Sequence, residues 1–262
     1  MGTLANVVRY KDNNLGDQLS TPALYIRWLA NADKIDPHDD RYPEMAATLR
    51  PRAMIVGVGG QIRNTAVQFD INLAAIGASG ILCVAWGIGH NTHNSTAVEY
   101  PSYLRDFSLV GLRDWGSPYE WVPCVSCLHP AFNKVRVTTT DVVLYEHWQM
   151  PSGVTGLPTL RNSHHSIDEV LDFMGSADTV ITNTYHGCYW ATLLGKKVVV
   201  VEPFSTKFMS MRYEVPFADH RDWRESLPIA RSHPQSLQEC RATNNAFAGK
   251  VKTLLTDNGI AL

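Results

Sequence analysis

The chain has 262 residues, of which 45% are hydrophobic and 18% are charged, a composition typical of a globular protein with one large core or two ordinary ones. Its 23 basic and 25 acidic residues are mixed along the chain and give a formal net charge of −2, so no broad cationic face for nucleic acid is evident. The start of the chain lacks an apolar signal core, and the uncharged stretch between Asp70 and Glu99 is rich in glycine, asparagine and histidine. We therefore expect a cytoplasmic protein with no transmembrane segment and no nucleic-acid partner.

Short β-rich segments alternate with helical patterns along the whole chain, which is typical of parallel sheets covered by helices. A threonine-rich stretch before residue 141 indicates a domain boundary, so we divide the chain into residues 1–135 and 136–262. In the first part the predicted strands, each followed by a turn with Gly, Asn or Asp, are 5–9, 53–58, 81–86, 108–112 and 121–125.

The second part repeats the plan of the first. Its predicted elements are a strand at 141–145, a helix opened by Ser166, a strand at 179–182, a helix at 186–194 that Gly195 ends, and a strand at 197–201. The loop 150–163 is long enough to be functional or mobile. A terminal helix from Ser236 onward could pack back across the first domain. The sequence thus predicts an α/β protein with two Rossmann-like halves.

Turns after the predicted strands are the candidate site positions, because ligands of open parallel sheets collect at the carboxyl ends of strands. In the first turn, Asp17 could cap the next helix or act on a ligand hydroxyl. The turn 57–61 is a glycine cluster that would let a ligand approach the backbone. The positions in these turns and in the turn 86–91 that we assign to the cleft are Asn14, Gly16, Gly59, Gly60 and His90.

Charged residues follow two further predicted strands, 108–112 and 197–201. Arg113 comes directly before Asp114, so it could grip a carboxylate or phosphate in bidentate fashion or form a structural ion pair. After the strand 197–201 come Glu202, Lys207 and Arg212. The two cations could reach the same cleft or be solvated surface charges.

The turn 182–187 is the most informative in the sequence. A strand ends there and a helix begins near His186, so unpaired amides and the positive end of the helix dipole favour an anion. The imidazole could donate a proton to a reacting group or bind phosphate, and the alternative is a histidine satisfied within the core.

The five cysteines indicate free thiols rather than a disulfide framework. Cys124 and Cys127 form a lone Cys-x-x-Cys pair, which could be half a zinc site, a redox pair or ordinary packing. A structural zinc ion needs two more ligands, and His129 nearby supplies one, so no metal is expected.

Taken in order, these motifs resemble those of the polysaccharide pyruvyl transferase family. Its members share an Asn-x-Gly-Asp turn, a glycine-rich second turn, a strand-end Arg-Asp and a late His-Gly motif, which correspond here to 14–17, 57–60, 113–114 and 177–187. The match spans nearly the whole chain. It departs from the family at Thr184, where many members have arginine, and at 123–130, where the family often has an Asp-Pro turn.

The resemblance implies a GT-B-like arrangement of the two domains and transfer of pyruvate from phosphoenolpyruvate to a sugar diol as a ketal. It implies no metal and no other cofactor, and a glycan or lipid-linked sugar of exopolysaccharide biosynthesis as acceptor. His186 would protonate the enol carbon, and Asp17 would orient or deprotonate the acceptor hydroxyl. Residues on the donor side would be Arg113, Lys207, Tyr185, Gly187 and Arg212.

Two other functions remain open from the sequence. A nucleotide-sugar-dependent glycosyltransferase could use the same architecture, with Glu202 binding a ribose. A non-catalytic sugar-binding or anion-binding relative is the second, and Thr184 in place of arginine motivates it. The sequence identifies neither the acceptor sugar nor whether the chain forms a homo-oligomer.

Overall fold

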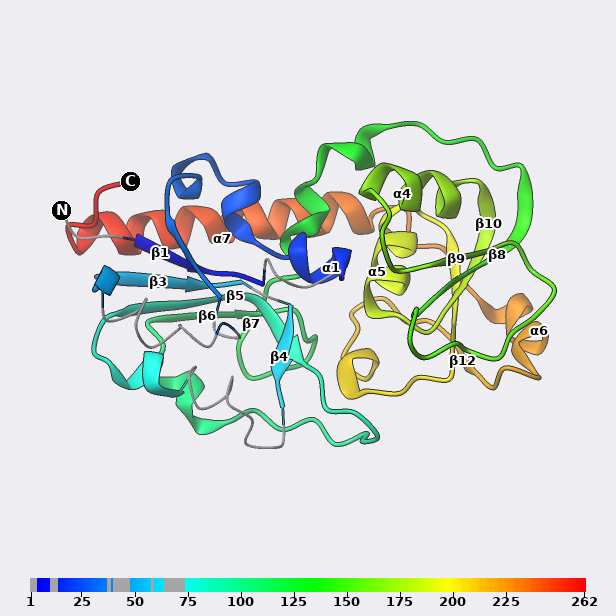
Figure 1. Ribbon diagram of the computed structural model, residues 1–262, viewed down its shortest axis with the longest axis horizontal. Coiled ribbons are helices and arrows are strands. Elements are labelled where there is room, and N and C mark those ends of the chain that lie inside the picture. The colour runs from blue at the N-terminus through cyan, green and yellow to red at the C-terminus, as the bar shows by residue number, and fades with distance from the viewer. Residues whose placement is uncertain (1–3, 10–13, 37–38, 40–47, 58, 64–73) are drawn as a thin grey trace.

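The computed structural model describes residues 4–9, 14–36, 39, 48–57, 59–63 and 74–262. It is an α/β protein with two sheets of parallel strands (Figure 1). The strands of the first sheet are β1 Leu4–Val7, β2 Asp33–Ile35, β3 Ala53–Val56, β4 Gly60–Ile62, β5 Leu82–His90, β6 Leu109–Leu112 and β7 Glu120–Trp121. Those of the second are β8 Thr140–Glu146, β9 Thr159–Arg161, β10 Ala177–Thr182, β11 Lys197–Val201 and β12 Phe217–Ala218.

The first sheet has the order β2-β1-β3-β5-β6-β7, and β4 pairs with the far end of β5. Its strands β1 and β3 are buried at every position, as expected of parallel strands covered on both faces. β5 runs four residues beyond the predicted end at Trp86. The predicted strand 121–125 was wrong beyond Trp121, because Pro123 has no N–H to donate and the chain then turns into a 3₁₀ helix. Position 58, where a strand was predicted to end, lies outside the described residues.

The second sheet has the order β12-β11-β10-β8-β9. The edge strand β9 lies inside the segment 150–163, which was predicted to be a loop, and it pairs with the end of β8. Ser166 caps the following helix through a reciprocal capping box with Glu169. The α-helices are α1 Leu15–Gln18, α4 Ile167–Gly175, α5 Tyr185–Leu193, α6 Trp223–Ser226 and α7 Ser236–Asp257. The 3₁₀ helices are η1 Pro22–Leu24, η2 Arg27–Leu29, η3 Ser102–Asp106, η4 Val125–Leu128, η5 Pro130–Asn133, η6 Thr206–Phe208 and η7 Leu227–Ile229.

The long helix α7 starts beside the second sheet and runs along the first (Figure 1). Near its start, Cys240 belongs to the core around the second sheet. Further along, Phe247, Val251 and Leu255 pack into the core of the first sheet against Trp86. The terminal helix therefore packs back across the first sheet, as the spacing of its apolar residues suggested.

The core around the second sheet also includes residues from before the predicted boundary at 135. Cys124, Cys127 and Phe132 pack there with Val143 and Val180. The segment between β7 and β8 thus belongs by packing to the second sheet. Within the described part of the chain, no helix combines the length and the hydropathy that crossing a membrane requires.

Candidate functional site

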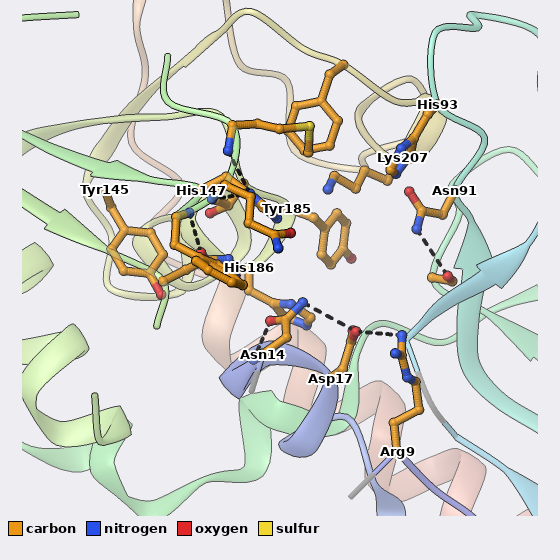
Figure 2. A pocket seen from close by; sticks show the side chains of 18 of the residues that line it. Arg9, Asn14, Asp17, Asn91, His93, Tyr145, His147, Tyr185, His186 and Lys207 are labelled. Carbon is orange, nitrogen blue, oxygen red and sulfur yellow. Dashed lines mark hydrogen bonds and ion pairs between the residues drawn. The ribbon is translucent and has the colours of Figure 1, made fainter. Parts of the chain in front are cut away.

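A cavity of about 390 Å³ opens where the two sheets face each other (Figure 2), a size usual for small-ligand sites. It is lined by residues that follow the carboxyl ends of β1 and β6 in the first sheet, and β8, β10 and β11 in the second. The predicted site residues that line it are Asn14, Gly16, Asp17, Gly60, Arg113, Tyr185, His186 and Lys207.

Positive charge is concentrated in this cavity. Four cationic side chains line it, from Arg9, Arg63, Arg113 and Lys207, against the single carboxylate of Asp17 among the described lining residues. Arg9 Nη1 lies 3.3 Å from Asp17 Oδ2, so one cation is partly neutralised. The chain as a whole has a formal net charge of −2. This cavity therefore favours an anionic ligand.

Arg113 reaches the cavity across glycines of the neighbouring strands β5 and β4. A Cβ atom at Gly89 would lie 2.7 Å from Arg113 Nε, and one at Gly60 would lie 2.7 Å from Nη2. The guanidinium carbon then sits 3.7 Å from the centre of the Tyr185 ring, across the gap between the sheets. Gly60 was assigned to ligand approach, and the structure gives it a further task, which is to leave room for Arg113.

Gly59 does not line the cavity. It has φ of 78°, in the left-handed region that favours glycine. A Cβ there would lie 3.0 Å from Asp17 Oδ1. Because glycine has no Cβ, the Asp17 carboxylate can approach the backbone of the turn that holds Gly59.

The Arg113 guanidinium is buried, and within the described residues no carboxylate forms an ion pair with it. The residue is 4% exposed, and its Nε finds no hydrogen-bond partner in the described part of the chain. Asp114 does not pair with it, because its Oδ2 accepts from the backbone N–H of His90 at 2.8 Å and the Tyr100 hydroxyl at 3.4 Å. The structural ion pair considered from the sequence is therefore not formed. A buried cation with unused donors is costly, and a bound carboxylate or phosphate would offset that cost.

Gly60→Ala should weaken binding of an anionic probe, inorganic phosphate, by about tenfold, because the new methyl group would displace the Arg113 guanidinium. Isothermal titration calorimetry measures the change. Gly249→Ala in α7 is the matched control, since a Cβ there meets no atom within 4 Å, and it should leave phosphate affinity unchanged. Equal affinities for the Gly60 variant and the native protein would contradict this account of Arg113.

His186 lies at the start of α5, with its imidazole between the cavity and the protein interior. Its residue is 9% exposed, and its Nε2 lies 3.3 Å from Ser20 Oγ and 3.6 Å from Cys124 Sγ. Burial, with Arg113 and Lys207 nearby, lowers the pKa of His186 well below its usual value. The imidazole is therefore neutral at pH 7 in the free protein. His186 is therefore mostly buried, but it still lines the cavity.

The Thr184 side chain has a structural task in this turn. It is the N-cap of α5, and its Oγ1 accepts a hydrogen bond from Gly187 N at 3.0 Å. Gly187 itself is packed beneath Thr182, Thr184 and Tyr145 and does not line the cavity. Thr184 thus serves as a helix cap at the start of α5.

Lys207 faces the cavity from η6 and is half-buried. Its Nζ lies 4.4 Å from the centre of the Phe204 ring. Burial and the Arg113 charge lower the pKa of Lys207 to about 7, and Asp17 opposes this shift. The ammonium is therefore only partly protonated at neutral pH, and a bound anion would favour its charged form.

Anion affinity should fall as the pH rises through 7, by up to about tenfold per unit above that value, because Lys207 then loses the charge that attracts the ligand. Below pH 7 the lysine is already protonated and its contribution is constant. Calorimetry of phosphoenolpyruvate binding in buffers of different ionisation enthalpy should show proton uptake above pH 7. Lys207→Arg stays charged, so it should remove the share of this uptake that belongs to the lysine; an unchanged uptake would assign the whole titration to another group.

Besides Gly59 and Gly187, three predicted site residues do not line the cavity. His90 is fully buried, with Nδ1 2.6 Å from Thr206 Oγ1, and it joins the end of β5 to the helical turn that carries Lys207. Glu202 accepts from the backbone N–H of His220 at 2.9 Å. Arg212 stacks 4.0 Å from the Trp115 ring and pairs with Glu239. Their predicted direct roles in the cleft are not supported by these positions.

Sequence reasoning missed several lining residues. Arg9 and Arg63 follow β1 and β4, and His147 follows β8. All three come just after a strand, which is the signal that could have found them.

Cys124 and Cys127 are buried in the core, and Cys127 Sγ accepts from Asn244 Nδ2 at 3.4 Å.

No protein-family model matches this chain, and no curated protein matches it. Among solved structures, the chain is similar to a functional uncharacterized protein, KP1_0663, from Klebsiella pneumoniae subsp. pneumoniae NTUH-K2044. The TM-score is 0.50 at 12% sequence identity, and the match covers 83% of this chain and 92% of that one. At this identity the likeness supports the α/β fold and carries no information on activity.

Proposed function

We propose that this protein transfers the pyruvyl group of phosphoenolpyruvate to two hydroxyls of a sugar, forming a ketal and releasing phosphate. The observation that carries the proposal is the buried Arg113 guanidinium, whose Nε has no hydrogen-bond partner among the described residues and which lies with Lys207 in a cation-rich cavity. Phosphoenolpyruvate carries a carboxylate and a phosphate, so it has two groups that such a cavity can bind. The proposal includes the finer fold assignment, two Rossmann-like domains in a GT-B-like arrangement.

Binding of the negatively charged donor would raise the pKa of the proposed acid, His186. In the free protein Arg113 and Lys207 help to keep His186 neutral. A bound phosphoenolpyruvate would neutralise these cations, which raises the pKa of the imidazole and lets it carry the proton that the enol carbon receives. Protonation of that carbon leaves an oxocarbenium-like centre for the first sugar hydroxyl to attack. The second hydroxyl then displaces phosphate.

Asp17 supports the acceptor half of the reaction. Its carboxylate lines the cavity opposite the second sheet and contacts Arg9 Nη1 and Asn14 Nδ2, both at 3.3 Å from Oδ2. These contacts fix its orientation, so it can accept a proton from a sugar hydroxyl or hold that hydroxyl in place. Asn14 thereby acts on the acceptor side through Asp17.

The missing family arginine does not remove the charge that a donor needs. Thr184 caps α5 instead, while Arg9 and Arg63 add two cations to the same cavity from the first sheet. We propose that this set, with Arg113 and Lys207, replaces the arginine. A glycan or lipid-linked sugar on the cytoplasmic side would be the acceptor.

A donor screen tests the proposal. The protein is incubated with phosphoenolpyruvate or with sugar nucleotides and a panel of glycans, and the release of phosphate or nucleotide is measured together with the mass of the glycan. Phosphate release with a pyruvylated glycan is the expected result. Nucleotide release would identify a glycosyltransferase instead, and tight phosphoenolpyruvate binding without turnover on any glycan would identify a non-catalytic relative.

A further inference from the structure

The imidazole of His186 is contacted on one edge by two side chains that come from outside its own helix, Ser20 and Cys124. Ser20 lies just after α1 and is 3% exposed, and Cys124 lies just before η4 and is 1% exposed. Both approach the same ring atom, Nε2, at 3.3 and 3.6 Å. Nothing in the proposed chemistry so far uses either side chain.

The direction of these hydrogen bonds follows from counting protons. Ser20 has one hydroxyl proton, and Gly16 O, which can only accept, lies 2.7 Å from its Oγ. The hydroxyl therefore donates to Gly16, and Ser20 Oγ can only accept from His186. A neutral imidazole carries one N–H, so that N–H is on Nε2.

Cys124 closes the same network without a conflict. Its Sγ lies 3.2 Å from Ser20 Oγ and 3.2 Å from Ser126 Oγ. Ser126 Oγ already accepts from Trp190 Nε1 at 3.0 Å, so its own proton is free to point at the sulfur. The thiol proton then points at Ser20, and the Nε2–H of His186 is shared between Ser20 Oγ and Cys124 Sγ, so every contact has a donor and an acceptor.

The other ring nitrogen is turned to Gly16, which lines the cavity. A Cβ at Gly16 would overlap Nδ1, so only glycine lets the backbone of α1 lie this close to the ring. In the described part of the chain no residue forms a hydrogen bond with Nδ1, and the buried side-chain atoms that lack a partner do not include it. Nδ1 thus contacts the space of the cavity.

We propose that Ser20 and Cys124 are positioning residues that hold His186 in the tautomer with hydrogen on Nε2, so that Nδ1 is the atom that takes up and delivers the proton. The inference that this proton goes to the donor rests on the proposed function. The tautomer itself does not. The same turn that supplies Asp17 would then also set the protonation site of the imidazole that faces it.

The tautomer can be observed in the native protein. Long-range ¹H–¹⁵N correlation spectra of protein labelled with ¹⁵N-histidine, recorded at pH 7.5, should show the His186 hydrogen on Nε2 and a bare Nδ1. Comparison with His186→Asn assigns the signals. A hydrogen on Nδ1 would overturn the proposal, whether or not the protein turns over phosphoenolpyruvate.

Two variants test the positioning role. Ser20→Ala should produce a mixture of tautomers, lower kcat by about tenfold and shift the pH dependence of kcat, with the affinity for phosphoenolpyruvate little changed. Ser20→Thr, which keeps the hydroxyl, should restore the single tautomer. The matched control is Ser236→Ala, because that serine is also buried and donates to a backbone carbonyl, Thr192 O, at 2.8 Å.

The outcomes separate this inference from the proposed function. A single Nε2–H tautomer that survives in Ser20→Ala would refute the role of Ser20. If Ser20→Ala does not fold, Cys124→Ser replaces it, and it should keep the network and the tautomer. The correct tautomer in a protein that never releases phosphate from phosphoenolpyruvate would refute the proposed reaction while leaving the tautomer assignment intact.

Discussion

Arg113→Met should lower the affinity for phosphoenolpyruvate by about a hundredfold and, in the free protein, raise the free energy of unfolding by about 1–3 kcal/mol. The two effects have opposite signs because the guanidinium is buried and, as far as the described residues show, forms no ion pair until an anion binds. Removing it relieves a cost in the free protein and removes the ligand's main partner. Calorimetric titration measures the affinity, and denaturant unfolding measures the stability.

Arg136→Met is the control for this prediction. The Arg136 side chain is also buried, but its Nε pairs with Asp172 at 2.9 Å, and it lies outside the cavity. This variant should lose stability and keep its affinity for phosphoenolpyruvate. If Arg113→Met bound the donor within about threefold of the native protein, the anion site would have to lie elsewhere.

His186→Asn should reduce kcat for ketal formation by about a thousandfold while leaving the affinity for phosphoenolpyruvate within a few-fold of the native value. The lowered pKa keeps the imidazole neutral in the free protein, so the proton that it gains only after the donor binds should add no more than a few-fold to donor affinity. Its contribution comes only when the enol carbon takes a proton. Phosphate release under saturating donor and acceptor measures kcat, and calorimetry measures donor affinity.

The matched control is His129→Asn. His129 lies away from the cavity, and its Nδ1 caps η5 by accepting from Ala131 N at 3.1 Å, a task that asparagine also performs. This variant should retain native kcat. A His186 variant with a tenth of native activity or more would mean that another group supplies the proton.

Much of the fold follows from local pattern. Buried apolar runs such as β3 and β11 are visible in the sequence because parallel strands are covered on both faces. The short edge strand β9 is not, since three residues with a half-polar pattern look like any loop. The strand predicted beyond Trp121 failed because a proline interrupts it, a signal that was present and deserved more weight.

The candidate site was predictable in position but less so in composition. Parallel strands bring their carboxyl ends together, which is why Asp17, Arg113, His186 and Lys207 were found from the sequence. A position near a strand end does not determine where the side chain points. Glu202, for example, accepts a hydrogen bond from the backbone of His220 rather than lining the cavity. The fit of Arg113 against Gly60 depends on contacts between distant turns, which no local pattern contains.

The helix α7 has a thermodynamic consequence. Since Cys240 and Phe247, less than two turns of the same helix apart, complete different cores, neither half of the protein can melt without uncovering apolar surface in the other. Heating should therefore produce one calorimetric peak rather than two, and a chain that ends before Ser236 should leave both halves without a native fold.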